Sequence, residues 1–354
     1  MVKVQEILEK GKPLYVGIDV HLKSWTVTVR TRDAELQTVS MVAGKEELER
    51  FLSSYGGHAI QAVYEAGYFG YSLHDFLQER GIDCVVTPPS MVPESAGNRV
   101  KTDKKDSRKL ARCLSNGELK RVYVPSAEER SARMVSRRRR QLLSDRTRVQ
   151  HRIKAELRFY GVGRQEMCGS WSLAYRKLLG EVKLHDRWAT ESFHQLLQEF
   201  DALSEQLAVQ TQLLKELAQT DRYQKRVALL RSIPGVGMVT AMEFLLELQD
   251  IGRFRTAKAL AAYLGLTPSQ YSSGEHTHLG SITGMGKPAL RAMLVESAWI
   301  LVAKDSSMRE RYEKLRVRAG GKRAIVAIAR HLALIARRIL LDEQPYNLCA
   351  AVAA

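Results

Sequence analysis

The sequence is poor in cysteine, and its four cysteines lie far apart. Cys84, Cys113, Cys168 and Cys349 show no Cys-x-x-Cys spacing. This arrangement predicts neither a disulfide framework nor a zinc knuckle. The chain also lacks an amino-terminal apolar run of the signal-peptide kind, and no stretch reaches ~18 uninterrupted apolar residues. We therefore expect a cytoplasmic protein with no membrane partner.

Acidic residues are also few relative to basic ones. The 354 residues include 39 Asp and Glu against 55 Lys and Arg, which gives a net charge of +16 and a pI of about 9.7. Residues 97–160 alone hold 20 Lys and Arg against 7 Asp and Glu. Such a cluster favours a polyanionic partner, because neutralised phosphates release their condensed counterions. The alternative is a merely solvated helix face. With 45% hydrophobic residues, the chain is long enough for two or three domains.

The first third of the chain alternates between short apolar runs and amphipathic segments. The patterns predict a mixed sheet flanked by helices in the order β-β-β-α-β-α-β-α, which resembles ribonuclease H-like folds. The expected strands are 14–20, 25–30, 36–42, 59–64 and 82–87, and the expected helices are 45–55, 70–80 and 103–116.

From about 126 to 230 the pattern is almost wholly helical. Apolar residues recur there at spacings of three and four, with one polar position, Gln210. Two interpretations remain open: an intramolecular helical hairpin, and a dimerising coiled coil, which we favour because so long a seam needs a partner. The seam consists of Phe193, Leu196, Phe200, Leu203, Leu207, Gln210, Leu214 and Leu217.

The last third begins with Ile233-Pro234-Gly235-Val236-Gly237, followed by an apolar helix over 238–248. This motif resembles the hairpin of a helix-hairpin-helix element, in which glycines let the backbone approach a phosphate; the alternative is an ordinary glycine-rich helix connection. A Ser/Gly-rich stretch at 269–287 interrupts helix formation. Strongly apolar helices over 288–302 and 322–341 close the chain.

Four carboxylates lie at predicted strand ends and at a predicted helix start, where the fold could bring them together. Asp19 ends the first expected strand and Glu65 ends the fourth, and these strands are neighbours in this topology. Asp103 and Asp106, three apart near a helix start, share one face. Gathered acids repel one another unless a cation lies between them, and oxygen ligands suit Mg²⁺ or Mn²⁺. A pair of such ions about 4 Å apart can activate the attacking oxygen and stabilise the leaving oxygen of a phosphodiester. The ordinary alternatives are a strand-end turn for Asp19 and a helix N-cap for Asp103.

Three segments resemble the DEDD-type transposases of bridge-RNA-guided insertion sequences: GIDVHLKSW at 17–25, VYEAG at 63–67 and NRVKTDKKDSRKLA at 98–111. The resemblance extends over residues 14–340. It implies a RuvC-like catalytic domain in which Asp19, Glu65, Asp103 and Asp106 bind the metal. The implied cofactor is Mg²⁺, with Mn²⁺ as a substitute, and the implied location is the cytoplasm of a bacterial or archaeal cell. It also implies donor and target double-stranded DNA, a guide RNA, and a homo-oligomer, either a dimer or a tetramer.

The resemblance continues in the segment Tyr271-Ser272-Ser273-Gly274. In the family the serine of the Ser-Gly pair is the nucleophile, which implies Ser273, with Ser272 as the rival. No Ser-His-Asp order is present, although His276 and His278 lie nearby. The family solution is a composite site in which the carboxylates and the serine come from different subunits and act through a phosphoserine link. The chain departs from the family pattern at Gly284–Pro288, where the lysine is shifted to Lys287.

The expected architecture is therefore α/β plus α: a RuvC-like catalytic domain over 1–125, a basic helical coiled-coil region over 126–228, and a serine-bearing transposase domain over 229–354. The sequence shows no recognition-helix signature for reading base edges, which fits sequence selection by RNA pairing. Backbone contacts are expected from Lys101, Lys104, Lys105, Arg137, Arg138, Arg139, Arg140, Gly235 and Gly237.

We thus expect an RNA-guided DNA transposase. A structure-selective nuclease resembling a Holliday-junction resolvase would need the carboxylates without the serine. A non-catalytic nucleic-acid-binding protein would use the basic helices with a degenerate acidic site.

Overall fold

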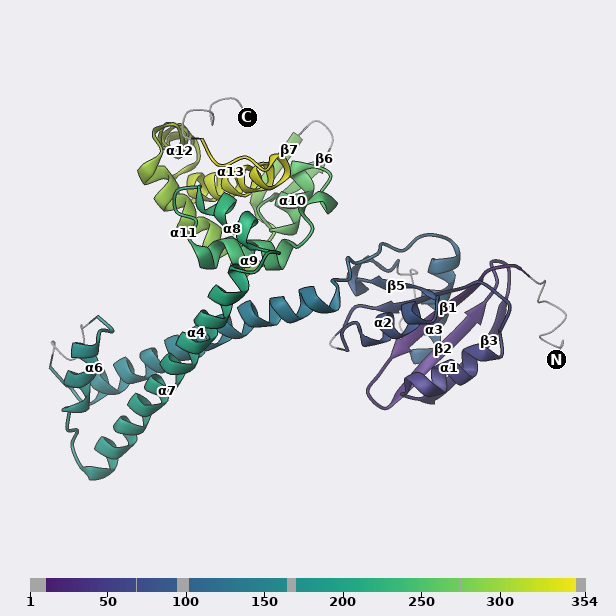
Figure 1. Ribbon diagram of the computed structural model, residues 1–354, viewed down its shortest axis with the longest axis horizontal. Helices are drawn as coiled ribbons and strands as arrows, with labels where there is room; N and C mark the ends of the chain where they lie inside the picture. Colours follow the sequence, from purple (N-terminus) through teal and green to yellow (C-terminus); the bar gives the residue numbers. More distant parts are fainter. Residues whose placement is uncertain (1–10, 68, 94–101, 164–169, 274–275, 348–354) are drawn as a thin grey trace. The chain divides into compact units, whose positions relative to one another are not determined.

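The computed structural model describes residues 11–67, 69–93, 102–163, 170–273 and 276–347, with the backbone alone described at 271–273 and 276–279. Lys101 lies outside the described residues. The chain divides into two compact units, Met1–Val124 and Pro125–Ala354 (Figure 1). Among the helices that are described, none combines the length and the apolarity needed to cross a membrane.

The first unit is a mixed sheet with helices on both faces. Its strand order is β3-β2-β1-β4-β5; β1 pairs antiparallel with β2 and parallel with β4. The predicted element order and the predicted adjacency of the first and fourth strands are confirmed. The elements are β1 (Leu14–Val20), β2 (Ser24–Arg30), β3 (Glu35–Val42), α1 (Lys45–Ser53), β4 (Ile60–Glu65), α2 (Ser72–Glu79), β5 (Asp83–Thr87), η2 (Pro89–Met91) and α3 (Asp103–Ser115).

The second unit begins with a helical hairpin formed by α4 (Ala127–Phe159) and α7 (Arg187–Ala218), with α6 (Leu173–Gly180) between them in sequence. A capping box starts α4: Ser126 accepts from the Glu129 backbone N–H, and the Glu129 carboxylate accepts from the Ser126 N–H. These reciprocal bonds satisfy amides that the first helical turn leaves without partners. Figure 1 shows the two helices running side by side.

The apolar seam of α7 packs against α4 of the same chain. Phe193 and Phe200 lie in one cluster with Val149 and Ile153 of α4, and the Gln210 amide donates to the Val135 carbonyl at 3.0 Å. The intramolecular hairpin is therefore present. Our reason for favouring a dimerising coiled coil, that the seam needs a partner, was wrong, because α4 supplies that partner.

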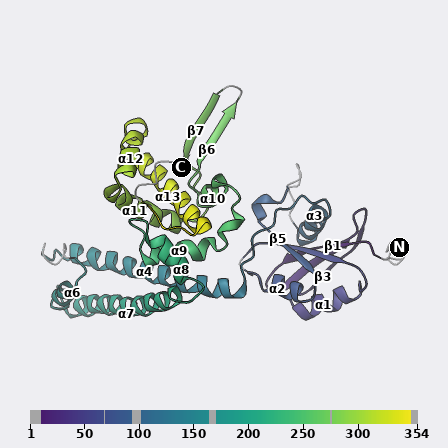
Figure 2. The ribbon, with the colours of Figure 1, turned by 45° about the horizontal axis from the view of Figure 1, so that its top comes forward.

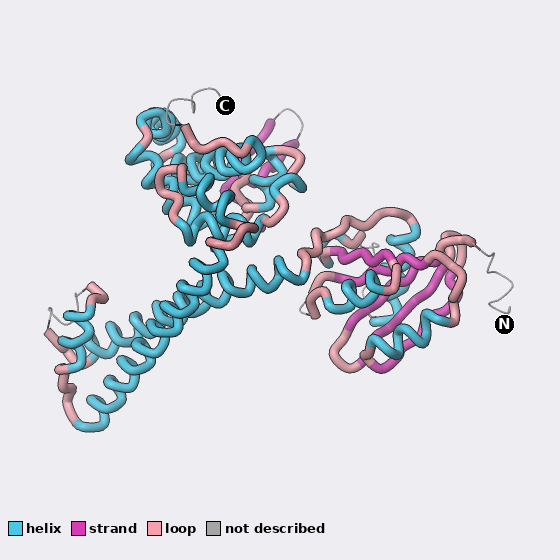
Figure 3. The backbone as a smooth tube through the Cα atoms, viewed as in Figure 1, coloured by secondary structure: helices cyan, strands magenta, loops and turns pink. Residues whose placement is uncertain are grey.

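Helices dominate the rest of this unit (Figure 3). Its core also takes in Ala132 of α4 and Leu214 and Ala218 of α7, so the first part of α4 and the last part of α7 pack into the core of the last third of the chain. The remaining helical elements are α8 (Gln224–Arg231), α9 (Met238–Leu248), η3 (Ile251–Arg253), α10 (Ala257–Tyr263), α11 (Pro288–Lys304), α12 (Ser306–Ala319) and α13 (Gly321–Asp342).

The Ser/Gly-rich stretch forms a β-hairpin that the sequence analysis did not predict. Its strands are β6 (Pro268–Ser273) and β7 (His276–Ile282), paired antiparallel. Figure 2 shows the hairpin extending away from the helices of its unit. The prediction that this stretch interrupts helix formation is confirmed.

Candidate metal centre and nucleic-acid surface

Strand periodicity places Asp19 and Glu65 on one face of the sheet. Successive side chains of a strand point to opposite faces. In β1, Val16 and Ile18 belong to the core beneath α1 and α2, so Gly17 and Asp19 face the other way. In β4, Val63 belongs to the core beneath α3, and Glu65, two residues on, shares its face. Because β1 and β4 are parallel with Ile18 opposite Tyr64, the two acids lie at the carboxyl ends of adjacent strands, at the same edge of the sheet.

Gly17 allows α3 to lie directly on β1. A Cβ atom at this glycine would stand 2.2 Å from the Ser107 carbonyl oxygen and 2.5 Å from the Ala111 backbone nitrogen. The Thr28 and Ser107 hydroxyls, 2.8 Å apart in the buried interface, join the helix to β2. This close approach carries the first turn of α3, with Asp103 and Asp106, to the sheet edge where Asp19 lies.

The four predicted acids line one cavity of about 550 Å³. The Asp19 side chain is 19% exposed, whereas that of Asp103 is 57% exposed. Asp103 is not a helix N-cap, because the N-cap of α3 is Thr102, which accepts from the Lys105 N–H. Asp19 is not a turn residue, because it pairs with Thr26 in the β1–β2 ladder. The cavity is lined by Asp19, Val20, His21, Glu65, Ala66, Gly67, Phe69, Pro89, Asp103 and Asp106.

The electrostatics of the cavity suit a cation. Burial raises the pKa of the Asp19 carboxyl above its ordinary value; His21 opposes this rise, and the charges of Asp103 and Asp106 add to it. A carboxylate crowded by like charges gains most from a divalent ion, which removes the repulsion that favours its proton. The donor set is mainly oxygen and fits Mg²⁺ or Mn²⁺. Asp19, Glu65, Asp103 and Asp106 are the acids that would hold such an ion.

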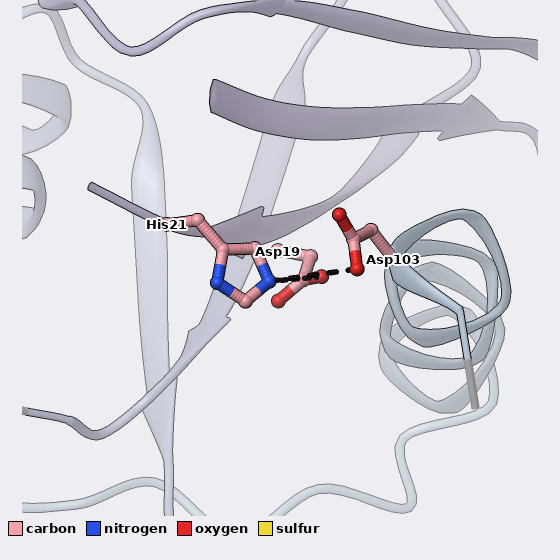
Figure 4. A group of neighbouring side chains, drawn as sticks. All are labelled: Asp19, His21 and Asp103. Atoms are coloured by element: carbon pink, nitrogen blue, oxygen red, sulfur yellow. Dashed lines mark hydrogen bonds and ion pairs between the residues drawn. The ribbon is translucent and has the colours of Figure 1, made fainter. Parts of the chain in front are cut away.

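His21 also reaches this cluster, and the sequence analysis overlooked it. Its Nε2 lies 3.1 Å from Asp19 Oδ2 and 3.7 Å from Asp103 Oδ1 (Figure 4). The signal was the Asp-x-His spacing in Asp19-Val20-His21, since residues two apart at a strand end face the same side. Asp19, His21 and Asp103 each offer a ligand atom within 4.8 Å of the others.

The arginine run on α4 is largely engaged within its own unit. Arg137 pairs with Glu247 at 3.1 Å, and Arg140 with Glu243 at 2.9 Å. Arg139 donates to the Thr211 hydroxyl, and Arg138, the exposed member of the run, donates to Gln206. Phosphate contacts are expected from all four arginines, and three of the four side chains are half-buried.

Glu243 and Glu247, four residues apart on the apolar helix α9, are each 2% exposed. Burial raises the pKa of Glu243, with Arg140 opposing. Burial likewise acts to raise the pKa of Glu247, but the hydrogen bond and charge of Arg137, with the charges of Lys287 and Arg133, hold it at about 2. Lys287 Nζ lies 3.6 Å from Glu247, so this shifted lysine contacts a buried carboxylate.

The first glycine of the Ile233–Gly237 motif is required by the structure. Gly235 has φ +88°, and a Cβ there would stand 2.6 Å from the Ser297 carbonyl oxygen. The backbone conformation and the contact with α11 both require glycine. Gly237 caps α9, and a Cβ there would meet open space. The two glycines thus differ: the first packs inward, and the second leaves the helix start accessible.

The remaining predicted residues are two lysines of α3 and the two serines of the β6–β7 hairpin. Lys104 and Lys105 are exposed in the first turn of α3, beside the acidic cavity. Ser273 is the last residue of β6, opposite His276 across the hairpin, and Ser272 stands opposite Thr277. The two serines therefore lie in the last two paired positions of the hairpin.

Comparison with known proteins agrees with this geometry. Residues 16–162 match a sequence profile for DEDD transposases of the IS110 type, described as "Transposase". Residues 227–313 match the "Transposase IS116/IS110/IS902 family". A DEDD domain of this kind implies dependence on a divalent metal.

Curated relatives also carry transposase names. Protein y4qE of Sinorhizobium fredii is 33% identical over 67% of this chain and 57% of its own length. Protein y4rJ of the same organism is 30% identical over 81% of this chain and 80% of its own. The transposase for insertion sequence element IS1533 of Leptospira borgpetersenii is 24% identical over 81% and 85%. The chain belongs to the IS110-type family of transposases, a class of DNA recombinases.

Proposed function

We propose that this chain is an RNA-guided DNA transposase of an insertion sequence. Asp19, Glu65, Asp103 and Asp106 would hold Mg²⁺, and Ser273 would be the nucleophile. The single observation that carries the proposal is the gathering of four acids from three separate segments around one cavity. Family membership supports DNA as the substrate, and the family match over residues 227–313 includes Ser273.

In the proposed reaction the Ser273 hydroxyl oxygen attacks a DNA phosphorus. A phosphoserine ester forms, the bond from phosphorus to the leaving sugar oxygen breaks, the serine proton passes to a base and the leaving oxygen takes up a proton. A DNA hydroxyl then attacks the phosphoserine and restores the serine. When bound, the divalent ion stabilises charge on the phosphate oxygens. The carboxylates and the serine would act on the same phosphate from different subunits.

The proposal is tested by sequencing RNA that copurifies with the full chain and supplying DNA that matches it. Ser273→Ala should abolish covalent protein–DNA adducts and strand exchange while nucleic-acid binding persists; Ser272→Ala is the matched control. Adducts at full yield in Ser273→Ala would move the role elsewhere. Metal-dependent cutting without any adduct in the unaltered protein would instead favour the resolvase-like nuclease.

The basic side chains of α4, and separately those of α3, would contact phosphate backbones rather than base edges. Arg138 is the informative residue, since it is exposed and, unlike Arg137 and Arg140, does not pair with the buried glutamates. Arg138→Gln should weaken nucleic-acid binding similarly for all sequences and reduce the salt slope by about one. Arg50→Gln, on an exposed helix of the first unit, is the control. An unchanged slope in Arg138→Gln would remove α4 from the interface.

A further inference from the structure

The His21 ring at the acidic cavity is placed like a ligand. Its Nε2 is directed between two carboxylates that come from different elements, Asp19 on β1 and Asp103 on α3 (Figure 4). The backbone holds it there independently of the ring, because the His21 N–H donates to the Ser24 carbonyl in the turn between β1 and β2. That turn therefore needs only the backbone of residue 21, and the imidazole is available for another task.

The spacing of the three ligand atoms fits one metal ion. In an octahedral sphere with ligands about 2.1 Å from the ion, neighbouring ligands are roughly 3.0 Å apart and opposite ligands roughly 4.2 Å apart. The separations of Nε2 from the two carboxylate oxygens, 3.1 Å and 3.7 Å, fall within that range. All three ligand atoms lie within 4.8 Å of one another.

A simple ion pair accounts for the arrangement less well. The His21 side chain is 53% exposed, and exposed pairs of this kind contribute little to stability. One imidazolium also carries a single positive charge, whereas Asp19, Asp103 and Asp106 all line the same cavity. A divalent ion would satisfy the carboxylates, and an imidazole nitrogen can coordinate the same ion.

We propose that His21 is a nitrogen ligand of the divalent ion held by Asp19 and Asp103, which gives this centre a mixed nitrogen and oxygen donor set. The inference rests on the metal centre of the proposed function. Imidazole binds first-row transition ions more strongly than it binds Mg²⁺. The centre therefore prefers Mn²⁺ and Co²⁺ over Mg²⁺ more than an all-carboxylate centre does.

Pulsed electron paramagnetic resonance of Mn²⁺ bound to the full chain tests this directly. The unaltered protein should show coupling to ¹⁴N, and that signal should convert to the ¹⁵N pattern when histidine alone is ¹⁵N-labelled. His21→Ala should abolish the histidine coupling, whereas His58→Ala should keep it. His58 is the matched control, since it precedes β4 at the opposite end of the sheet, where its ring contacts the Lys12 carbonyl.

Titration with Mn²⁺ and Mg²⁺ supplies a second readout. His21→Ala should weaken Mn²⁺ binding about tenfold, the lower bound for groups that support a metal, with a smaller effect on Mg²⁺. His21→Gln serves as the conservative variant should the alanine variant misfold, and the labelling experiment needs no variant at all.

The outcomes separate the two hypotheses. Mn²⁺ that binds without histidine coupling in the unaltered protein overturns His21 ligation and leaves the carboxylate centre intact. Failure of the unaltered protein to bind Mn²⁺, or equal binding by Asp19→Asn, overturns the metal centre and this inference together.

Discussion

The two units each contain a group of neighbouring acids, and the groups are balanced in opposite ways. Glu243 and Glu247 of the second unit are almost fully buried, and Arg133, Arg137, Arg140 and Lys287 surround them. In the first unit, Asp19 and Asp103 share His21, which carries a charge only when protonated. The first unit's group opens to a cavity, and the second unit's group is part of a packed core.

The difference shows that neighbouring carboxylates can either pair with cations of the chain or form a site for a cation from solution. Where the chain supplies surplus cations, buried carboxylates become fixed counter-ions that attach one helix to another. Where acids open to a cavity and share a histidine that is charged only when protonated, they fit a cation from solution. Acidity alone therefore does not mark a functional site; the balance of charge around the acids does.

Asp19→Asn should have the largest effect on activity. The substitution keeps the side-chain shape but removes a largely enclosed charge of the cavity, so strand cleavage should fall by about a hundredfold or more, since even residues that only support a metal ligand cost 10–100-fold. Cleavage of matched DNA at fixed Mg²⁺ measures it. Asp33→Asn, at an exposed turn, is the control. Undiminished cleavage by Asp19→Asn would reject the contrast between the two groups.

Glu247→Gln should have the largest effect on stability. It leaves Arg137 and Lys287 beside a neutral partner inside the second unit, and breaking a buried pair costs about 3–5 kcal/mol. Urea unfolding of the full chain, followed by circular dichroism, measures the loss. Glu205→Gln, on the exposed side of α7, should change the free energy of unfolding by less than about 0.5 kcal/mol. Similar values for both variants would show that the buried network is dispensable.

Gly17→Ala should act on both stability and metal binding. The added methyl group meets the backbone of α3, and such overpacking costs about 1–3 kcal/mol. Displacement of α3 would carry Asp103 away from Asp19, so Mn²⁺ affinity should fall as well. Gly44→Ala is the control, because a Cβ there meets its nearest neighbour at 3.7 Å. Full Mn²⁺ affinity in Gly17→Ala would mean that the close contact does not position the acids.

The smallest expected effect is on the pH dependence of stability, and it comes from His331, which lies beside an arginine rather than beside acids. Burial, with the charge of Arg311, lowers the pKa of His331 to about 4, against about 6.5 in the unfolded chain. Between these values the unfolded state binds more protons, so the free energy of unfolding should fall as the pH drops from about 6.5 to 4. His331→Gln should flatten this part of the profile. Melting temperatures across that range measure it, and an unchanged slope would assign the acid sensitivity to other groups.

Much of the first unit could be predicted from the sequence because its signals are local. Alternating apolar residues give the strands, and the ends of the first and fourth strands place Asp19 and Glu65 at one edge. His21 could have been found by the same periodicity, but a histidine after a strand is also an ordinary turn residue.

The second unit was harder to predict, because partners distant in sequence decide its structure. The apolar seam of α7 is equally compatible with α4 and with a second chain, and only packing shows that α4 covers it. The arginine run had the same ambiguity, because Glu243 and Glu247 lie about a hundred residues away.

By itself the sequence determined the element order of the first unit, the strand-end positions of two acids and the family to which the chain belongs, because each depends on periodicity or on contiguous motifs. Tertiary structure decided which charges neutralise one another, that Gly17 admits α3 onto β1, and that an imidazole joins the carboxylates. These outcomes depend on distances between segments, and a linear pattern does not contain those distances.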